Sequence, residues 1–162
     1  MAEPRPLRGV VDEAGLRRWG EAIGRETATP QVLALHGDLG AGKSTLARAI
    51  ARGAGVAGLV PSPTYNLQLV YPLPGGGALR HLDLYRIDHQ DQVWELGWAE
   101  LGNPAEIVLI EWAENAATIL PAPRWEVTLE EAEDPSLRTV AAVAVGDPPP
   151  LPSLPSLRDA GG

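Results

Sequence analysis

Residues 37–45 read Gly37-Asp38-Leu39-Gly40-Ala41-Gly42-Lys43-Ser44-Thr45 and contain the strongest structural signal in this chain. They match the phosphate-binding-loop pattern of glycine, any four residues, Gly-Lys and then Ser or Thr. The apolar run 32–36 precedes the loop and predicts a buried strand of the kind found in parallel sheets. Residues 46–50 follow with apolar side chains at helical spacing. Strand, glycine-rich loop and helix together are the context in which this motif binds nucleotide phosphates.

The rest of the pattern predicts an α/β fold: a P-loop NTPase-like three-layer arrangement with a mostly parallel central sheet and antiparallel additions. We expect helices over two stretches, residues 12–25 and 91–101. We expect a buried strand at 106–110 and two pairs of antiparallel strands, at 65–71 with 78–86 and at 125–130 with 138–145. The turn signal Pro72-Leu73-Pro74-Gly75-Gly76-Gly77 joins the first pair as a hairpin.

The composition favours one domain. The chain has 162 residues, of which 44% are hydrophobic, and we expect residues 1–146 to form a single ATPase-type domain. From residue 147 the sequence is rich in proline, and residues 147–162 are expected to be a disordered or loosely packed tail. A polyproline ligand for a partner protein is the alternative for this segment.

Charge and residue usage exclude several classes of protein. The net charge of −8 argues against a surface that binds nucleic acid without a partner. The absence of cysteine excludes disulfides, thiolate zinc sites and cysteine nucleophiles. No stretch approaches the roughly 20 apolar residues of a membrane span, and the first eleven residues lack the apolar run of a signal peptide. We therefore expect a cytoplasmic protein without a membrane segment.

Lys43 is the only lysine in the chain. An ammonium on a flexible stem can reach between β- and γ-phosphate oxygens, where a planar guanidinium fits poorly. No lysine remains for the Asn-Lys-x-Asp motif with which many GTPases select guanine. None remains either for the separate lysine of a protein kinase. A Ras-like switch and a protein kinase are therefore both disfavoured.

A phosphate-loop enzyme also needs oxygen ligands for Mg²⁺ and an acidic residue near that metal. Ser44 supplies a hydroxyl, and two carboxylates are candidates for the acid. Glu111 follows the apolar strand 107–110, whereas Asp83 shares a strand face with His81 and Tyr85. We assign Glu111 to Mg²⁺ and Asp83 to orienting or deprotonating the attacking water. A solvated strand face at Asp83 and an exposed strand-end carboxylate at Glu111 are the alternatives.

Two further residues lie where a nucleotide site would need them. Thr64 sits in Pro61-Ser62-Pro63-Thr64-Tyr65, where a switch segment that senses the γ-phosphate would lie. A plain loop threonine is the alternative. Trp112 follows Glu111 and could stack on a base or a partner, although a tryptophan is more often part of the core.

The motifs GDLGAGKST, PSPTY, HLDLYR and IEW occur in this order and at this spacing, and over about residues 10–130 the chain resembles the TsaE (YjeE) family. Members are small bacterial ATPases required to make threonylcarbamoyladenosine next to the anticodon of tRNA. The resemblance implies that such a protein binds ATP and Mg²⁺ and hydrolyses ATP slowly. It also implies that it acts with TsaB and TsaD, which hold the tRNA.

The resemblance assigns roles to matched positions. Lys43 and Ser44 would hold the phosphates and Mg²⁺, and Glu111 would be a further Mg²⁺ ligand. Asp83 would be needed for hydrolysis and Thr64 would belong to a switch. Trp112 would lie near the nucleotide, and Glu13 is raised as a contact to the nucleotide's edge. The family more often has threonine at the position of Ser44, which keeps the hydroxyl, and the proline-rich tail departs from the family pattern.

Two other functions remain open from the residues. In a small-molecule kinase, Asp83 would deprotonate a substrate hydroxyl, but the arginines that a kinase lid would carry are scattered over predicted strands. In a non-catalytic nucleotide-binding adaptor, nucleotide binding alone would change the affinity for a partner.

Overall fold

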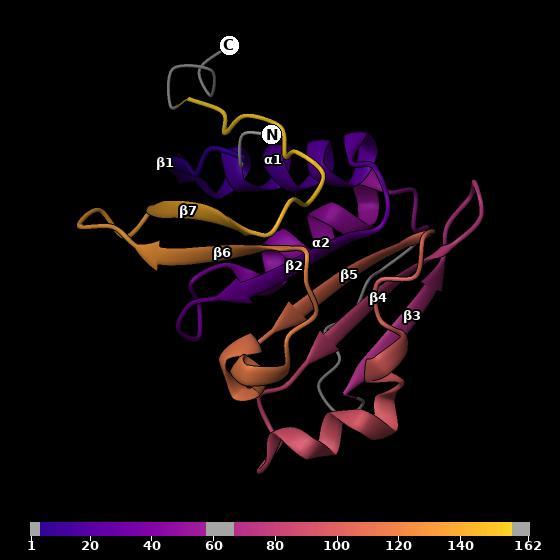
Figure 1. Cartoon of the computed structure of the whole chain (residues 1–162). Coiled ribbons are helices and arrows are strands. Elements are labelled where there is room, and N and C mark those ends of the chain that lie inside the picture. The colour runs from indigo at the N-terminus through magenta and orange to yellow at the C-terminus, as the bar shows by residue number, and fades with distance from the viewer. Residues whose placement is uncertain (1–3, 58–66, 157–162) are drawn as a thin grey trace.

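The structure, a computed structural model, describes residues 4–57 and 67–156. Within these residues seven strands form one sheet in the order β1-β7-β6-β2-β5-β4-β3 (Figure 1). The strands are β1 (Leu7–Asp12), β2 (Gln31–His36), β3 (Gln68–Pro72), β4 (Ala78–Asp83), β5 (Glu106–Glu111), β6 (Arg124–Glu131) and β7 (Leu137–Val145).

The centre of the sheet is parallel and its margins are antiparallel. β2 pairs in parallel with both β5 and β6, and β5 pairs in parallel with β4. The pairs β3–β4, β6–β7 and β1–β7 are antiparallel. All of β5 and nearly all of β2 are buried, as continuous apolar runs predict for strands covered on both faces. The expected P-loop NTPase-like α/β fold, with a mostly parallel sheet and antiparallel additions, is confirmed.

Two helices cover one face of the sheet: α1 (Glu13–Glu26) and α2 (Lys43–Gly53) (Figure 1). Asp12 caps α1, since its carboxylate accepts a hydrogen bond from the backbone N–H of Gly15 at 2.7 Å. The helices approach closely because glycine lies at their contact. A Cβ built on Gly24 would lie 2.0 Å from the carbonyl oxygen of Ile50. This packing fixes the axis of α2, and therefore the direction in which its N-terminus points.

The other face of the sheet is covered by 3₁₀ turns, namely η1 (Gln90–Leu96), η2 (Trp98–Glu100) and η3 (Ala113–Ile119). The prediction of one helix over residues 91–101 is wrong. Gly97 adopts a left-handed conformation with φ of 76° and separates η1 from η2. Trp98 then turns into the core and donates its indole N–H to the carbonyl of Ile119 at 2.7 Å. Burial of this tryptophan outweighs the helical pattern.

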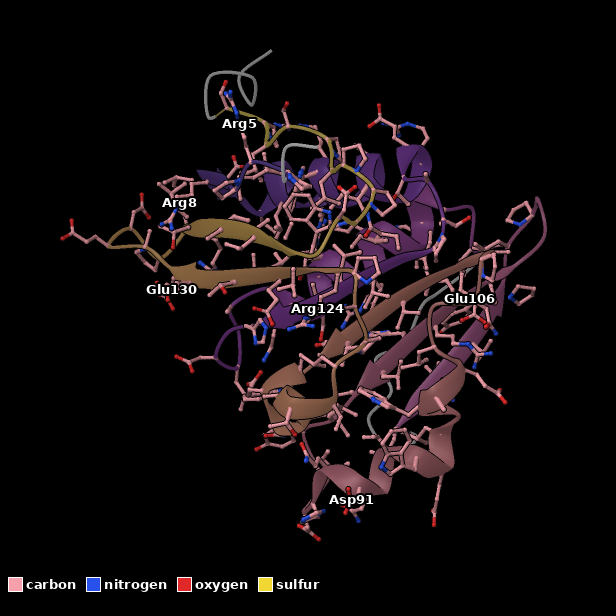
Figure 2. The ribbon with its side chains drawn as sticks, viewed as in Figure 1. Arg5, Arg8, Asp91, Glu106, Arg124 and Glu130 are labelled. Atoms are coloured by element: carbon pink, nitrogen blue, oxygen red, sulfur yellow. The ribbon has the colours of Figure 1, made fainter. Side chains whose placement is uncertain are left out.

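The edge strand β1 was not expected from the sequence. Its run Leu7-Arg8-Gly9-Val10-Val11 contains an arginine and a glycine and shows no clear alternation. A Cβ on Gly9 would lie 3.2 Å from Leu154, so the glycine leaves room for the C-terminal segment. Glu106 begins β5, at the end of the sheet's parallel core that lies away from the glycine-rich loop (Figure 2). Its carboxylate pairs with Arg80 at 3.0 Å.

Residues 147–156 of the expected disordered or loosely packed tail pack against the domain, and residues 157–162 lie outside the described residues. The indole N–H of Trp125 donates to the carbonyl of Pro149 at 2.7 Å, and that of Trp19 donates to Pro152 at 2.9 Å. Leu151 and Leu154 add to the core that α1 covers. A proline has no N–H to satisfy, whereas its carbonyl accepts normally. The segment therefore supplies acceptors for two buried indoles, and this requirement is invisible in its composition.

None of the helices that the structure describes combines the length and apolarity needed to cross a membrane.

Truncation after Gly146 tests the role of this segment. We expect the free energy of unfolding to fall by about 3 kcal/mol, because two buried donors lose their acceptors at about 1–3 kcal/mol each. A chain ending at Ser156 keeps these contacts and serves as the control. Denaturant unfolding measures the difference, and equal midpoints for the two truncated chains would contradict the packing role.

Candidate nucleotide-binding site

The phosphate loop joins β2 to α2 and bends through glycines in the left-handed region. Gly40 has φ of 82°, and Gly42, the residue that caps α2, has φ of 111°. A side chain at Gly42 would be strained in this conformation and would also meet Leu16 at 2.9 Å. The loop thus ends at a helix N-terminus, whose free N–H groups and dipole favour an anion.

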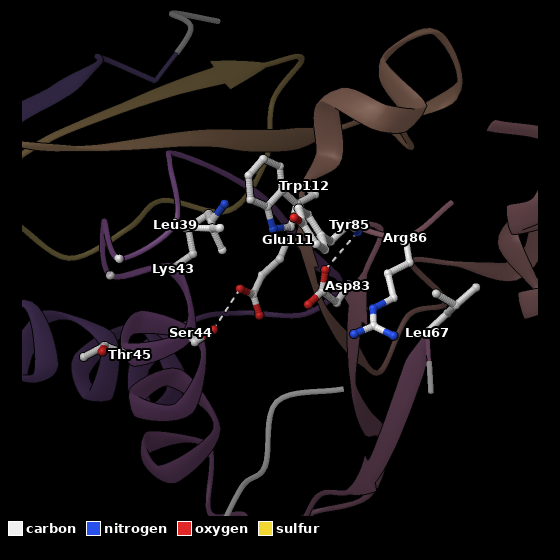
Figure 3. Close-up of a pocket in the computed structure, with 12 residues that line it drawn as sticks. Leu39, Lys43, Ser44, Thr45, Leu67, Asp83, Tyr85, Arg86, Glu111 and Trp112 are labelled. Atoms are coloured by element: carbon white, nitrogen blue, oxygen red, sulfur yellow. Dashed lines mark hydrogen bonds between the residues drawn. The ribbon is translucent and has the colours of Figure 1, made fainter. Parts of the chain in front are cut away.

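Residues at the ends of three neighbouring strands meet at this helix N-terminus. The pairing register sets Leu35 of β2 and Asp83 of β4 opposite Glu111 of β5. The carboxyl ends of parallel strands share one edge of a sheet, so the loop, Asp83 and Glu111 come together there. They line a cavity of about 370 Å³ with Lys43, Ser44, Thr45 and Trp112 (Figure 3).

Glu111 is buried and is held from two sides. Ser44 Oγ donates to one carboxylate oxygen at 3.0 Å, and Nε2 of His81 lies 2.5 Å from the other. Burial acts to raise the pKa of Glu111, but the hydrogen bond and attraction of His81, with the contributions of Ser44 and Lys43, outweigh it and lower the pKa. Glu111 is therefore a carboxylate at neutral pH, fixed beside the hydroxyl of Ser44.

Lys43 is buried and folds back over the loop. Its ammonium donates to the carbonyl of Gly37 and lies 3.4 Å from the centre of the Trp112 ring, within cation–π range. Burial lowers the pKa of Lys43, against the raising effect of Glu114, Glu111, Asp83 and Asp38. The Lys43 ammonium thus lies near several carboxylates at the N-terminus of α2.

Asp83 ends β4 and is half-buried. One carboxylate oxygen accepts the backbone N–H of Tyr85 at 3.0 Å, as Figure 3 shows. Burial raises the pKa of Asp83, and the charge of Glu111 adds to the rise, whereas the Tyr85 hydrogen bond, His81 and Lys43 oppose it. A carboxylate with a raised pKa beside an anion-binding helix is a candidate acid–base group.

The structure brings most of the predicted site residues together. Leu39, Gly40, Gly42, Lys43, Ser44, Thr45, Asp83, Glu111 and Trp112 line the cavity of about 370 Å³ at the N-terminus of α2, called here the Lys43 cavity. Gly37, Asp38 and Ala41 line a hollow on the other side of the loop, with Trp112 and Glu114. Thr64 lies outside the described residues.

Glu13 is not among the residues that line the Lys43 cavity. It lines an adjoining hollow of about 520 Å³ that shares Gly40, Gly42 and Thr45 with that cavity. Its carboxylate pairs with Arg17 at 2.7 Å. Glu13 therefore lies beside the loop, in a hollow next to the cavity that holds Lys43 and Glu111.

Sequence reasoning missed three residues that shape the site. His81 was placed on the polar face of its strand but not against Glu111, and the two-residue spacing from Asp83 was the only signal. Arg86 lines the Lys43 cavity, and Arg138 contacts the loop. No local pattern marks Arg138, because its contacts reach residues 97 and 98 positions away.

Two oxygen ligands beside the loop are suited to Mg²⁺. Ser44 and Glu111 offer a hydroxyl and a carboxylate oxygen, which are hard ligands of the kind that Mg²⁺ prefers. Across residues 4–57 and 67–156, no group of three or more His, Asp or Glu side chains is arranged to hold a metal ion. Mg²⁺ at nucleotide sites commonly uses one or two protein ligands, with phosphates and water completing its shell.

A glycine-rich loop between a buried strand and a helix, with acidic residues at the neighbouring strand ends, defines a protein of the P-loop NTPase-like fold class. Residues 10–140 match the family described as "Threonylcarbamoyl adenosine biosynthesis protein TsaE". The chain belongs to the TsaE family.

Individual relatives agree with this assignment. The chain is 35% identical to the TsaE protein of Haemophilus influenzae over 130 residues, which cover 77% of this chain and 82% of that protein. It is 38% identical to the TsaE protein of Rickettsia typhi over 125 residues, which cover 76% and 85%. Among solved structures, that of Bacillus subtilis YdiB superposes with a TM-score of 0.71 at 27% identity and 90% coverage of each chain.

Replacement of Asp83 by asparagine should raise thermal stability at neutral pH. Because the folded-state pKa of Asp83 is raised, its contribution to stability is present at acid pH and is lost as the pH rises through that value. The asparagine side chain would carry no charge and could still accept the Tyr85 hydrogen bond. We expect a higher melting temperature than wild type at pH 7.5, converging as the pH falls toward about 4.

The control for this experiment is Asp134→Asn. Hydrogen bonds from Ser136 lower the pKa of Asp134, so its contribution has the opposite sign and is present at neutral pH. The measurement is the melting temperature of wild type and both variants across this pH range, without nucleotide or metal. A lower melting temperature for Asp83→Asn at pH 7.5 would show that the Asp83 charge stabilises the fold.

Proposed function

We propose that this protein is a Mg²⁺-dependent ATPase that binds ATP at the phosphate loop and hydrolyses it slowly. We propose further that it acts with TsaB and TsaD homologues in forming threonylcarbamoyladenosine on tRNA. The observation that carries the first proposal is the placement of Lys43, Ser44, Asp83 and Glu111 around one cavity at the N-terminus of α2. The relatives are named as tRNA threonylcarbamoyladenosine biosynthesis proteins, which supports the second.

Each group has a role in this reaction. Backbone N–H groups of the loop would hold the phosphate oxygens, and Lys43 would leave the carbonyl of Gly37 to pair with them. Ser44 and Glu111 would hold Mg²⁺, which neutralises charge on the β- and γ-phosphates. Asp83 would orient the attacking water or accept its proton, and its raised pKa makes it a stronger base than an ordinary aspartate. Trp112 would exclude water from the Lys43 side.

Two features support a role for partners: exposed side chains line the cavity, and the chain is acidic. Tyr85 and Leu39 at the cavity are exposed, so water reaches the site from that side. A partner that covers this side would exclude bulk water and strengthen the electrostatic interactions within the cavity. The acidic chain leaves binding of the tRNA to TsaB and TsaD.

Phosphate release from ATP, measured with and without TsaB and TsaD from the same organism, tests the proposal. We expect slow release from the protein alone, stimulation by the two partners, and loss of both with Lys43→Ala, because that change removes the ammonium at the phosphates. A phosphorylated metabolite in place of free phosphate would identify a kinase. ATP binding with no phosphate release, even with partners, would identify an adaptor.

The metal role of Glu111 gives a separate prediction. Glu111→Gln should raise the Mg²⁺ concentration for half-maximal hydrolysis by at least about tenfold, since it replaces a charged ligand with a neutral one. Glu106→Gln is the matched control, because Glu106 lies at the other end of β5 and pairs with Arg80 (Figure 2). An unaltered Mg²⁺ dependence in Glu111→Gln would move the metal role to Asp83.

A further inference from the structure

Arg138, near the start of β7, reaches across to the phosphate loop. Its Nε donates to the carbonyl of Ala41 at 3.2 Å, and one terminal nitrogen donates to the carbonyl of Gly40 at 3.3 Å. The other terminal nitrogen donates to the carbonyls of Pro135 and Leu137 at 2.7 and 3.0 Å. Among the residues that the structure describes, Arg138 takes part in no ion pair with a carboxylate. Its donors are directed instead at backbone carbonyls.

Hydrogen bonds hold the turn that precedes Arg138 in one conformation. The carboxylate of Asp134 accepts hydrogen bonds from the backbone N–H and the hydroxyl of Ser136 at 2.9 and 2.7 Å. The N–H of Leu137 donates to the carbonyl of Asp134 at 2.9 Å, which closes the turn between β6 and β7. Arg138 follows this turn directly, so the guanidinium joins a closed turn to the loop.

The contacts fall on the carbonyl side of a loop whose N–H side is needed for an anion. In a phosphate loop the N–H groups converge on the ligand, so the carbonyls of the same peptide groups point away from it. A planar guanidinium can hold two adjacent carbonyls at once through donors in fixed directions. The carbonyl of Ala41 shares its peptide group with the N–H of Gly42, so a fixed positive charge against that oxygen stabilises the orientation that presents this N–H to phosphate. The carbonyl of Gly40 shares its peptide group with the N–H of Ala41, which donates to the carbonyl of Asp38 at 3.0 Å, so the contact with Gly40 stabilises the turn of the loop.

We propose that Arg138 is a positioning residue for nucleotide binding: it holds the carbonyls of Gly40 and Ala41 so that the loop is preformed for phosphate. This inference rests on the proposed nucleotide binding. Arg138 also lines the hollow that contains Glu13, where it could touch a base directly. The two roles differ, because a residue that acts through the loop affects every nucleotide equally.

The experiment compares wild type, Arg138→Met, Arg138→Lys and the control Arg124→Met by calorimetric titration with ATP and with ITP. Arg124 lies on the neighbouring strand β6 (Figure 2). It pairs there with Glu126 at 3.2 Å. We expect Arg138→Met to weaken binding of ATP and ITP by the same factor, at least about tenfold. Arg138→Lys should recover only part of the lost affinity, since one ammonium cannot reproduce the directed donors of a guanidinium. Arg124→Met should bind both nucleotides as wild type does.

Hydrogen exchange without nucleotide gives a second readout that a general loss of stability would not mimic. We expect faster exchange in Arg138→Met at residues 37–44 and at the turn 134–138, both of which the guanidinium contacts, with the central strands unchanged. Loss of ATP affinity but not of ITP affinity would assign Arg138 to the base and overturn the inference. So would wild-type affinity in Arg138→Met. If the wild-type protein binds no nucleotide, the proposed function fails first.

Discussion

The parallel pairing of β2 with β5 sets the position of Glu111, and the geometry of the site depends on that carboxylate. The register places Glu111 beside Leu35, one residue before the end of the strand that leads into the phosphate loop. From there it bonds to Ser44 on α2 and to His81 on β4. A buried charge is tolerated only when it is paired and hydrogen-bonded. One carboxylate therefore joins a helix and a neighbouring strand at the place where chemistry is proposed.

The charges around this carboxylate limit what can bind. Four carboxylates act on Lys43, namely Glu114, Glu111, Asp83 and Asp38. A triphosphate that enters brings further negative charge into a site where like charges already repel. Loop N–H groups, the helix dipole and Lys43 offset part of this repulsion. A divalent cation at Ser44 and Glu111 would offset more, so the acidity of the site is itself an argument for Mg²⁺.

The sequence predicted the parts of this fold in which local pattern and burial agree. The apolar runs predicted β2 and β5, the glycine-rich motif predicted the phosphate loop, and the apolar spacing predicted α1. For each of these segments the local pattern is compatible with only one arrangement in the fold. The failures occurred where a distant contact outweighs local pattern. The buried Trp98 and the left-handed Gly97 divide the predicted helix. In β1, the missing side chain at Gly9 leaves room for Leu154. The proline-rich segment packs because Trp19 and Trp125 need acceptors, and nothing within residues 147–156 reveals that need.

Trp112 illustrates how backbone conformation connects two interpretations that sequence leaves open. Among the described residues it is the only non-glycine with positive φ, at 56°. Such a conformation costs about 1–3 kcal/mol and persists only when surrounding structure enforces it. Here Ala113 is buried and the carbonyl of Trp112 accepts the N–H of Asn115 at 3.0 Å. The same conformation carries the indole over Lys43 and to 5.0 Å from the Tyr85 ring. Trp112 therefore does both: it packs against the core cluster beneath η3, and its indole lines the cavity beside Lys43.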